Sequence, residues 1–136
     1  MKIFSTAISD RYAQLCLLIV RVAVSAFMLT HGWPKLGRLM SGEEIKFADP
    51  FGLGPAFSLV LVVFAEVFCS ILIILGLGTR LASIPLIITM SIAAFHAHAN
   101  DPFGTKEKPL LFLLLYIILL VFGSGKYSVD RMISRK

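Results

Sequence analysis

Charged residues are scarce in this chain: they make up 15 % of its 136 residues, whereas hydrophobic residues make up 57 %. A soluble domain carries about 25 % charged and about 45–50 % apolar residues. The deficit excludes a disordered chain and an ordinary cytosolic enzyme, because too much apolar surface would face water. The sequence therefore predicts one membrane-embedded domain over residues 1–136, with the lipid bilayer against its apolar faces.

Cysteine is also scarce, since the chain has only Cys16 and Cys69, and they form no Cys-x-x-Cys pair. This excludes a disulfide-stapled secreted domain and gives no thiol-redox or zinc signature. Both cysteines lie inside apolar runs, where we expect small buried side chains without a disulfide. The net charge of +5 comes from residues that flank the apolar runs and form no basic, aromatic-rich stripe, so nucleic-acid binding is excluded.

Four apolar runs dominate the chain, and we expect transmembrane helices at about residues 12–33, 55–77, 81–99 and 106–126. A helix needs ~20 residues to cross a ~30 Å hydrocarbon core, with its backbone hydrogen bonds internal. Pro34 is expected either to end the first helix or to bend it so that His31 and Lys35 point inward. The fourth run is long enough only if Lys106 and Lys126 reach the interface. The predicted fold is all-α: a four-helix transmembrane bundle with up-down antiparallel topology.

Lysine and arginine are distributed unevenly between the two sides of this arrangement. Seven lie in the N-terminal segment, the second connection and the C-terminal segment, against five in the first and third connections. The positive-inside rule therefore predicts that both termini of this multi-pass protein are cytoplasmic, and we expect its membrane to be the inner (plasma) membrane of a prokaryote. Near the C-terminus, Ser128 is expected to cap a short basic helix at the interface.

Two ionisable residues, Arg21 and Glu66, interrupt the apolar runs, and a charge at the bilayer centre costs about 2.5–3.5 kcal/mol or more. A helical rise of ~1.5 Å per residue places Arg21 roughly 14 Å from the inner edge and Glu66 about 16 Å from the outer edge. Because these depths coincide in a ~30 Å core, we expect an ion pair. The pair either fixes the register of two helices or serves as a proton relay or ligand anchor.

A second polar group lies near the outer ends of the first and third predicted helices, and it consists of His31, Lys35, His96, His98 and Asp101. All three histidines fall within the outer ~8 Å of the core. Side chains two residues apart point about 200° apart on a helix, which disfavours a three-histidine metal site, and no metal is predicted. The group is therefore either a site for a polar ligand or quinone head group, or an interfacial polar belt.

Five short motifs, in order along the chain, resemble the DoxX family of small four-helix membrane proteins. They lie at residues 17–23 (LLIVRVA), 31–36 (HGWPKL), 65–67 (AEV), 75–82 (LGLGTRLA) and 125–130 (GKYSVD). The resemblance covers roughly residues 12–133. Each motif alone is weak, but five in the right order on four apolar runs are a specific combination.

The resemblance implies a redox function. The family takes its name from a subunit linked to quinol oxidase and thiosulfate:quinone oxidoreductase activity, while other members are associated with redox homeostasis. It therefore implies a quinone-linked redox subunit that binds a quinone and belongs to a larger redox complex or a homo-oligomer. In that function the expected catalytic residues are His31, Glu66 and His96. The expected ligand-binding residues are Arg21, Lys35, His98 and Asp101.

A second hypothesis from a different class is a non-catalytic scaffold or assembly factor for other membrane proteins, which distant relatives of the family resemble. In that case Arg21 and Glu66 would only fix the helix register. The small residues Gly76 and Gly78 would then form a close-contact face for a partner helix.

Overall fold

The computed structural model describes residues 3–135, and every regular element in that range is helical. The all-helical class is therefore confirmed for these residues. The elements are α1 (Asp10–Met40), a continuous rod of α2 (Pro55–Val63), η1 (Phe64–Cys69) and α3 (Ser70–Leu75), a second rod of α4 (Thr79–Ile92) and η2 (Ala93–Ala97), α5 (Phe103–Phe122) and α6 (Val129–Ser134). The segments η1 and η2 are π-helical.

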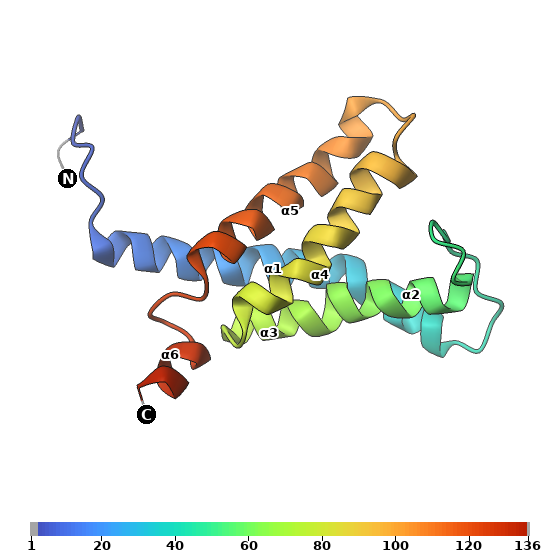
Figure 1. The fold of residues 1–136 in the computed structure, drawn as a ribbon, viewed down its shortest axis with the longest axis horizontal. Helices are drawn as coiled ribbons and strands as arrows, with labels where there is room; N and C mark the ends of the chain where they lie inside the picture. Colours follow the sequence, from blue (N-terminus) through green and yellow to red (C-terminus); the bar gives the residue numbers. More distant parts are fainter. Residues whose placement is uncertain (1–2, 136) are drawn as a thin grey trace.

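Two helix hairpins cross obliquely, as Figure 1 shows: α1 lies alongside the α2–α3 rod, and α4 lies alongside α5. Gly76 and Gly78 form the tight turn between α3 and α4 with φ angles of 70° and 60°. Residues with a Cβ rarely adopt this left-handed conformation. The hairpins meet near this turn and separate toward the connections 41–54 and 98–102 (Figure 1).

Three helical stretches in the described range are long and apolar enough to cross a membrane: Asp10–Met40, Pro55–Leu75 and Thr79–Ala97. Helices therefore occupy the first three predicted spans, except that α1 continues to Met40. In contrast, α5 has 20 residues but carries Lys106, Glu107 and Lys108 near its start. Its crossing of the membrane, and with it the four-helix up-down arrangement, stays a prediction.

Pro34 lies inside α1, so the first alternative, that it ends the first helix, is wrong, and the bend stays a prediction. A proline removes one backbone hydrogen bond, but neighbouring helices and local adjustment make it tolerable in membrane helices. As a result, α1 has 31 residues and extends well beyond the apolar run.

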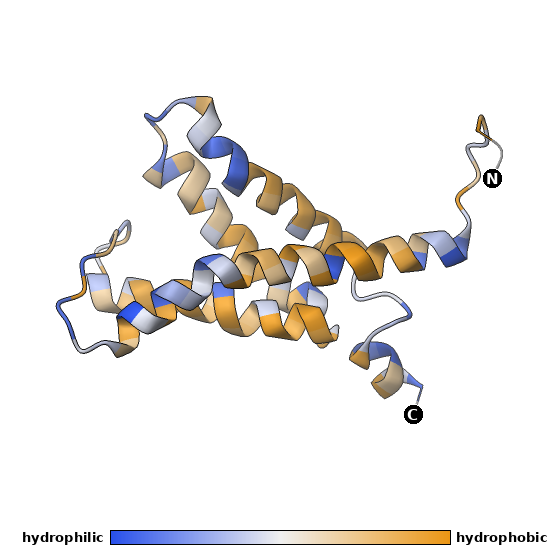
Figure 2. Ribbon diagram, turned by 180° about the vertical axis from the view of Figure 1, so that it is seen from behind, coloured by the Kyte–Doolittle hydropathy of each residue, from blue (hydrophilic) through white to orange (hydrophobic). Residues whose placement is uncertain are grey.

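Large apolar side chains cover the outside of the molecule as well as its core. Met28 and Leu86 are at most 1 % exposed, whereas Ile19 and Phe27 are 66 % and 63 % exposed. Figure 2 shows hydrophobic colours along most of the helices and hydrophilic colours at the connections and the first turns of α5. Such an outer surface suits lipid rather than water. Cys69 is buried as expected, but Cys16 lies exposed on this outer surface.

Arg21 is 2 % exposed and binds the C-terminal segment of the chain. Its guanidinium donates hydrogen bonds to the backbone carbonyls of Ser124, of Tyr127 at 2.7 Å and of Ile74 at 3.5 Å. The predicted Arg21–Glu66 ion pair is therefore wrong. The depth estimate placed both residues at one level, whereas Glu66 lies against Gly32. Gly32 is about 16 Å further along α1 than Arg21.

The C-terminal segment is also attached to the α3–α4 turn. The Asp130 carboxylate accepts a hydrogen bond from the Gly78 amide at 2.9 Å, and the Asp130 amide donates to the Gly76 carbonyl at 3.0 Å. Ser128 caps α6 by accepting a hydrogen bond from the Arg131 amide at 3.3 Å, which confirms the predicted cap. Arg21 and this turn together hold residues 123–130 against the base of the bundle.

Gly32 is the point of closest approach between α1 and η1. A Cβ at this position would lie 2.8 Å from Glu66 Cβ and 2.9 Å from Val67 Cγ2, so Gly32→Ala would force the helices apart. We expect Gly32→Ala to lower the free energy of unfolding by about 1–3 kcal/mol, measured by circular dichroism in mixed micelles. Gly37→Ala is the matched control on the same helix, because nothing lies within 4 Å of a Cβ there. Equal stability of the two variants would contradict the close contact.

Candidate functional site

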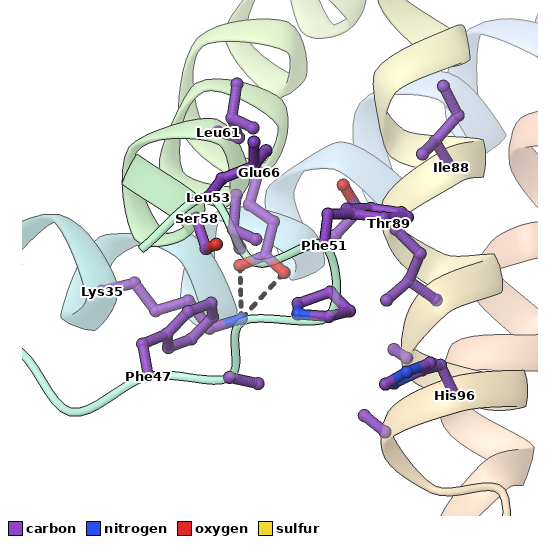
Figure 3. Close-up of a pocket in the computed structure, with 16 residues that line it drawn as sticks. Lys35, Phe47, Phe51, Leu53, Ser58, Leu61, Glu66, Ile88, Thr89 and His96 are labelled. Atoms are coloured by element: carbon purple, nitrogen blue, oxygen red, sulfur yellow. Dashed lines mark hydrogen bonds and ion pairs between the residues drawn. The ribbon is translucent and has the colours of Figure 1, made fainter. Parts of the chain in front are cut away.

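Lys35 and Glu66 form an ion pair at the end of the molecule where the two hairpins separate (Figure 3). The Nζ atom of Lys35 lies 2.8 Å from Oε1 and 2.7 Å from Oε2 of Glu66. The side chain of Glu66 is 3 % exposed and that of Lys35 is 27 % exposed. An uncompensated charge in such a site costs several kcal/mol, so Lys35 allows Glu66 to be ionised there.

Three local features bring the pair together. Because α1 stays helical through Pro34, Lys35 lies one turn beyond His31 and on the same face. Gly32 allows the backbone of η1 to approach closely. Glu66 itself lies in the π-helical segment η1, and π-helical segments within α-helices frequently mark functional sites. The second π-helical segment, η2, carries His96 on the other hairpin (Figure 3).

A cavity of about 210 Å³, here called the Phe51 cavity, lies between the 47–53 connection and the rods α2–η1 and α4–η2. Its lining is mostly apolar and includes Phe47, Phe51, Leu53, Leu61, Val62, Ile88 and Ile92, together with Lys35, Glu66 and His96. The hydroxyls of Ser58 and Thr89 also line it, but they donate to Asp49 and to the Pro85 carbonyl. The polar groups that remain for a ligand are the Lys35–Glu66 pair and His96.

A second cavity, of about 140 Å³ and here called the Phe112 cavity, lies on the other side of the ion pair. It shares Lys35, Glu66 and Ala93 with the Phe51 cavity. Its remaining lining residues are Met28, His31, Met90, His98, Lys108, Pro109 and Phe112. The rings of His31 and Phe112 are nearly perpendicular, with an interplanar angle of 86° and ring centroids 5.8 Å apart. The ion pair therefore forms a partition between two cavities of different character.

The structure brings most of the predicted site residues to this partition. His96 lines the Phe51 cavity, while His31 and His98 line the Phe112 cavity. The expected divergence of His96 and His98 is thus confirmed, since they line different cavities. Asp101 contacts His98 instead of a cavity, with Oδ2 at 2.7 Å from Nδ1. Arg21 lies at the opposite end of the bundle.

Metal binding at these residues has no geometric support in the described part of the chain. Among residues 3–135, no three His, Cys, Asp or Glu side chains are close enough together to hold a metal ion. The three histidines therefore do not converge on one point within that range.

The connection 41–54 covers the Phe51 cavity, and sequence reasoning missed its contribution. Phe47 and Phe51 form part of the wall, and Asp49 fixes the connection through Leu53, Gly54 and Ser58 at 2.9, 2.9 and 3.1 Å. Removal from water would raise the pKa of Asp49, but the hydrogen bonds from these residues outweigh that effect and hold the pKa below its usual value. The Asp-Pro pair before an apolar run was the available signal.

Comparison with known proteins gives a consistent picture. The sequence model of the DoxX family matches residues 16–99. An uncharacterised Haemophilus influenzae protein is 30 % identical over 66 % of this chain and 63 % of its own length, so this chain spans less than two thirds of it. The inner membrane protein YqjF of Escherichia coli is 26 % identical over 88 % of this chain and 92 % of its own length. A second uncharacterised Haemophilus protein is 28 % identical over 93 % and 97 %. No solved structure matches the chain.

The long apolar helices, their lipid-suited outer surface and the buried ion pair define a helical membrane protein. More narrowly, the chain belongs to the DoxX family, whose model matches more than half of it. The resemblance predicted from five motifs is therefore confirmed. Of these motifs, the one at 125–130 lies outside the matched residues and is the segment that Arg21 holds.

The unequal exposure of Lys35 and Glu66 predicts unequal effects of removing them. Lys35→Met leaves a deeply buried carboxylate without a partner and should lower the free energy of unfolding by about 3 kcal/mol. Glu66→Gln should cost less, because the partly exposed Lys35 can turn its ammonium toward water. The double variant should be more stable than Lys35→Met alone. Unfolding in mixed micelles measures all three.

The control is the Arg21–Glu66 pair, which the structure does not contain. Arg21→Met and Glu66→Gln should have additive effects on stability, since the two side chains share no contact partner. Coupling between Arg21 and Glu66, or its absence between Lys35 and Glu66, would contradict the observed pairing.

The depressed pKa of Asp49 predicts that the stability of the 41–54 connection, which covers the Phe51 cavity, depends on pH. Its folded pKa is depressed, so the ionised carboxylate stabilises the connection above the unfolded value of about 4, and this stabilisation is lost as the pH falls further. Amide protection factors at Leu53 and Gly54, measured by NMR, should therefore decrease in acid. In Asp49→Asn they should be low and independent of pH. Unchanged protection of the wild-type amides in acid would contradict this assignment.

Proposed function

We propose that this protein is a quinone-linked redox subunit and that the Phe51 cavity receives the quinone head group. The observation that carries the proposal is the combination of apolar walls with a small set of convergent polar groups: the Lys35–Glu66 pair and His96. Ligand sites for apolar molecules typically have this composition. Glu66, which the sequence led us to expect as a catalytic residue, lines the Phe51 cavity, whereas His31 lines the neighbouring Phe112 cavity.

The size and surroundings of the Phe51 cavity favour a quinone whose ring lies in the cavity and whose tail remains in lipid. The cavity volume of about 210 Å³ is below the ~300 Å³ of typical sites for drug-sized ligands, so it suits a head group alone. Leu61 and Ile88 line the cavity and are also 44 % and 53 % exposed on apolar helices. An isoprenoid tail would leave the cavity between them and enter the bilayer directly.

The chain's own residues would bind the head group and handle protons. Lys35 has an ammonium that can donate to one quinone carbonyl, and His96 can donate to the other or accept a proton from it. Reduction of a quinone to a quinol takes two electrons and two protons. The electrons would come from a partner protein that carries a redox cofactor, which agrees with the expected larger redox complex.

We further propose a four-span topology in the inner membrane with both termini cytoplasmic. The YqjF protein, which is similar over most of its length, is described as an inner membrane protein. In α5 the charged residues Lys106, Glu107 and Lys108 occupy the first turns, and the rest of the helix is apolar. These charges would lie at the outer interface, while α6, which Lys126 precedes and Arg135 and Lys136 follow, would lie at the inner one.

The scaffold hypothesis is less well supported. Its proposed docking face contains Gly76, yet a Cβ at Gly76 would lie 2.5 Å from Ser128 Cβ. The chain's own C-terminal segment therefore covers Gly76 and prevents close approach of a partner helix there, whereas nothing lies within 4 Å of a Cβ at Gly78.

Quinone binding tests the proposed function directly. The protein, purified in nanodiscs, should carry extractable quinone or bind a short-chain ubiquinone analogue in calorimetry. We expect His96→Asn to weaken binding about tenfold, which corresponds to loss of one hydrogen bond of ~1.4 kcal/mol. Phe95→Leu is the matched control, because Phe95 is 65 % exposed on η2 and does not line the cavity. Absence of binding, or equal loss in both variants, would refute the proposal.

A further inference from the structure

The two cavities beside the ion pair differ in what surrounds their openings. The Phe51 cavity reaches the surface at the exposed apolar residues Leu61 and Ile88 and also at the exposed residue His96. The Phe112 cavity instead reaches it at the exposed residue Lys108 and at His98. His98 and Asp101 form an ion pair with side chains 40 % and 45 % exposed. The opening of the Phe51 cavity is therefore mainly apolar, whereas the opening of the Phe112 cavity is polar and suits water.

The charged groups around the Phe112 cavity come from α1, η1, α5 and the residue after η2, whereas α4 and η2 contribute only Met90 and Ala93. His31 and Lys35 project from α1, Glu66 from η1, His98 from the residue after η2, and Lys108 from α5. Four of these five groups are basic. A volume of about 140 Å³ has room for several water molecules at ~30 Å³ each, and these polar groups provide their hydrogen-bond partners.

We infer that the Phe112 cavity is a water-filled vestibule through which Glu66 exchanges protons with the aqueous side that bears the 98–102 connection. The route follows from the shared lining: Glu66 belongs to both cavities, and His31 and His98 belong to the Phe112 cavity. The Asp101 carboxylate holds the His98 ring at the surface end of this route.

The proton transfer has two steps. A proton from bulk water binds to an imidazole nitrogen of His98 or His31 and passes, through vestibule water, to the Glu66 carboxylate, forming an O–H bond there. Neutralising Glu66 releases the Lys35 ammonium from its partner and leaves it free to donate into the Phe51 cavity. This inference rests on the proposed function only for the use of the proton, because water access to Glu66 does not require a quinone.

Cysteine accessibility tests the vestibule without any quinone. Met90 and Ile88 lie two residues apart on α4, and Met90 lines the Phe112 cavity while Ile88 lines the Phe51 cavity. In a Cys16→Ala, Cys69→Ala background, each is replaced by cysteine and treated with the membrane-impermeant anion sulfonatoethyl methanethiosulfonate. We expect Met90→Cys to react at least tenfold faster, because a thiolate forms in water and not in lipid. Adding Lys108→Glu should slow that reaction, since it reverses the charge at the opening.

Proton exchange at Glu66 is tested separately. Dicyclohexylcarbodiimide, a lipid-soluble reagent, modifies protonated carboxyl groups, and mass spectrometry locates the product. Modification of Glu66 should become faster as the bulk pH falls, because the vestibule equilibrates this carboxyl with water. Equal reaction of the two cysteine variants, or a modification rate that does not change with pH, would overturn the inference. Either result is independent of quinone binding, so this failure and that of the proposed function are distinguishable.

Discussion

The constraint on which this structure depends is that a carboxylate buried among membrane helices must have a cation within hydrogen-bond distance. Glu66 meets it with Lys35, and several features follow. α1 has to continue past Pro34 so that Lys35 reaches the level of Glu66, and Gly32 has to be small so that the two helices can approach. The hairpins can then separate beyond this contact and leave a cavity on each side of the pair.

The composition and the apolar runs were sufficient to predict the helical class, the first three spans and their order. Helix ends were harder to predict, because Pro34 normally disfavours helical geometry before it, while the surrounding membrane helices compensate for the lost hydrogen bond. The polar residues of the site were recognised from their low frequency in apolar runs. The pairing of Glu66 with Lys35 was not predicted. The depths of Arg21 and Glu66 were estimated as if the two helices ended at the same membrane level, although α1 is longer than the rod beside it.

The contributions of the connecting segments to the candidate site were harder to predict from the sequence. Asp49 and Phe51 lie in a segment whose composition indicates only a turn, and their role depends on how that segment folds back over the cavity. The π-helical geometry of η1 and η2 had no counterpart in the hydrophobic pattern, since a single π-helical segment leaves the apolar periodicity of a short run nearly unchanged. Yet both of these segments border the Phe51 cavity, and they carry its acid and its histidine.

The position of Arg21 has a consequence for how the protein is made. This arginine lies on the first helix, but two of the carbonyls that bind it, those of Ser124 and Tyr127, lie 103 and 106 residues further along the chain. Until they arrive, the guanidinium is held in an apolar environment without its final partners. The environment of Arg21 is therefore complete only after α5 and the segment that follows it have been made and have packed against the first helix.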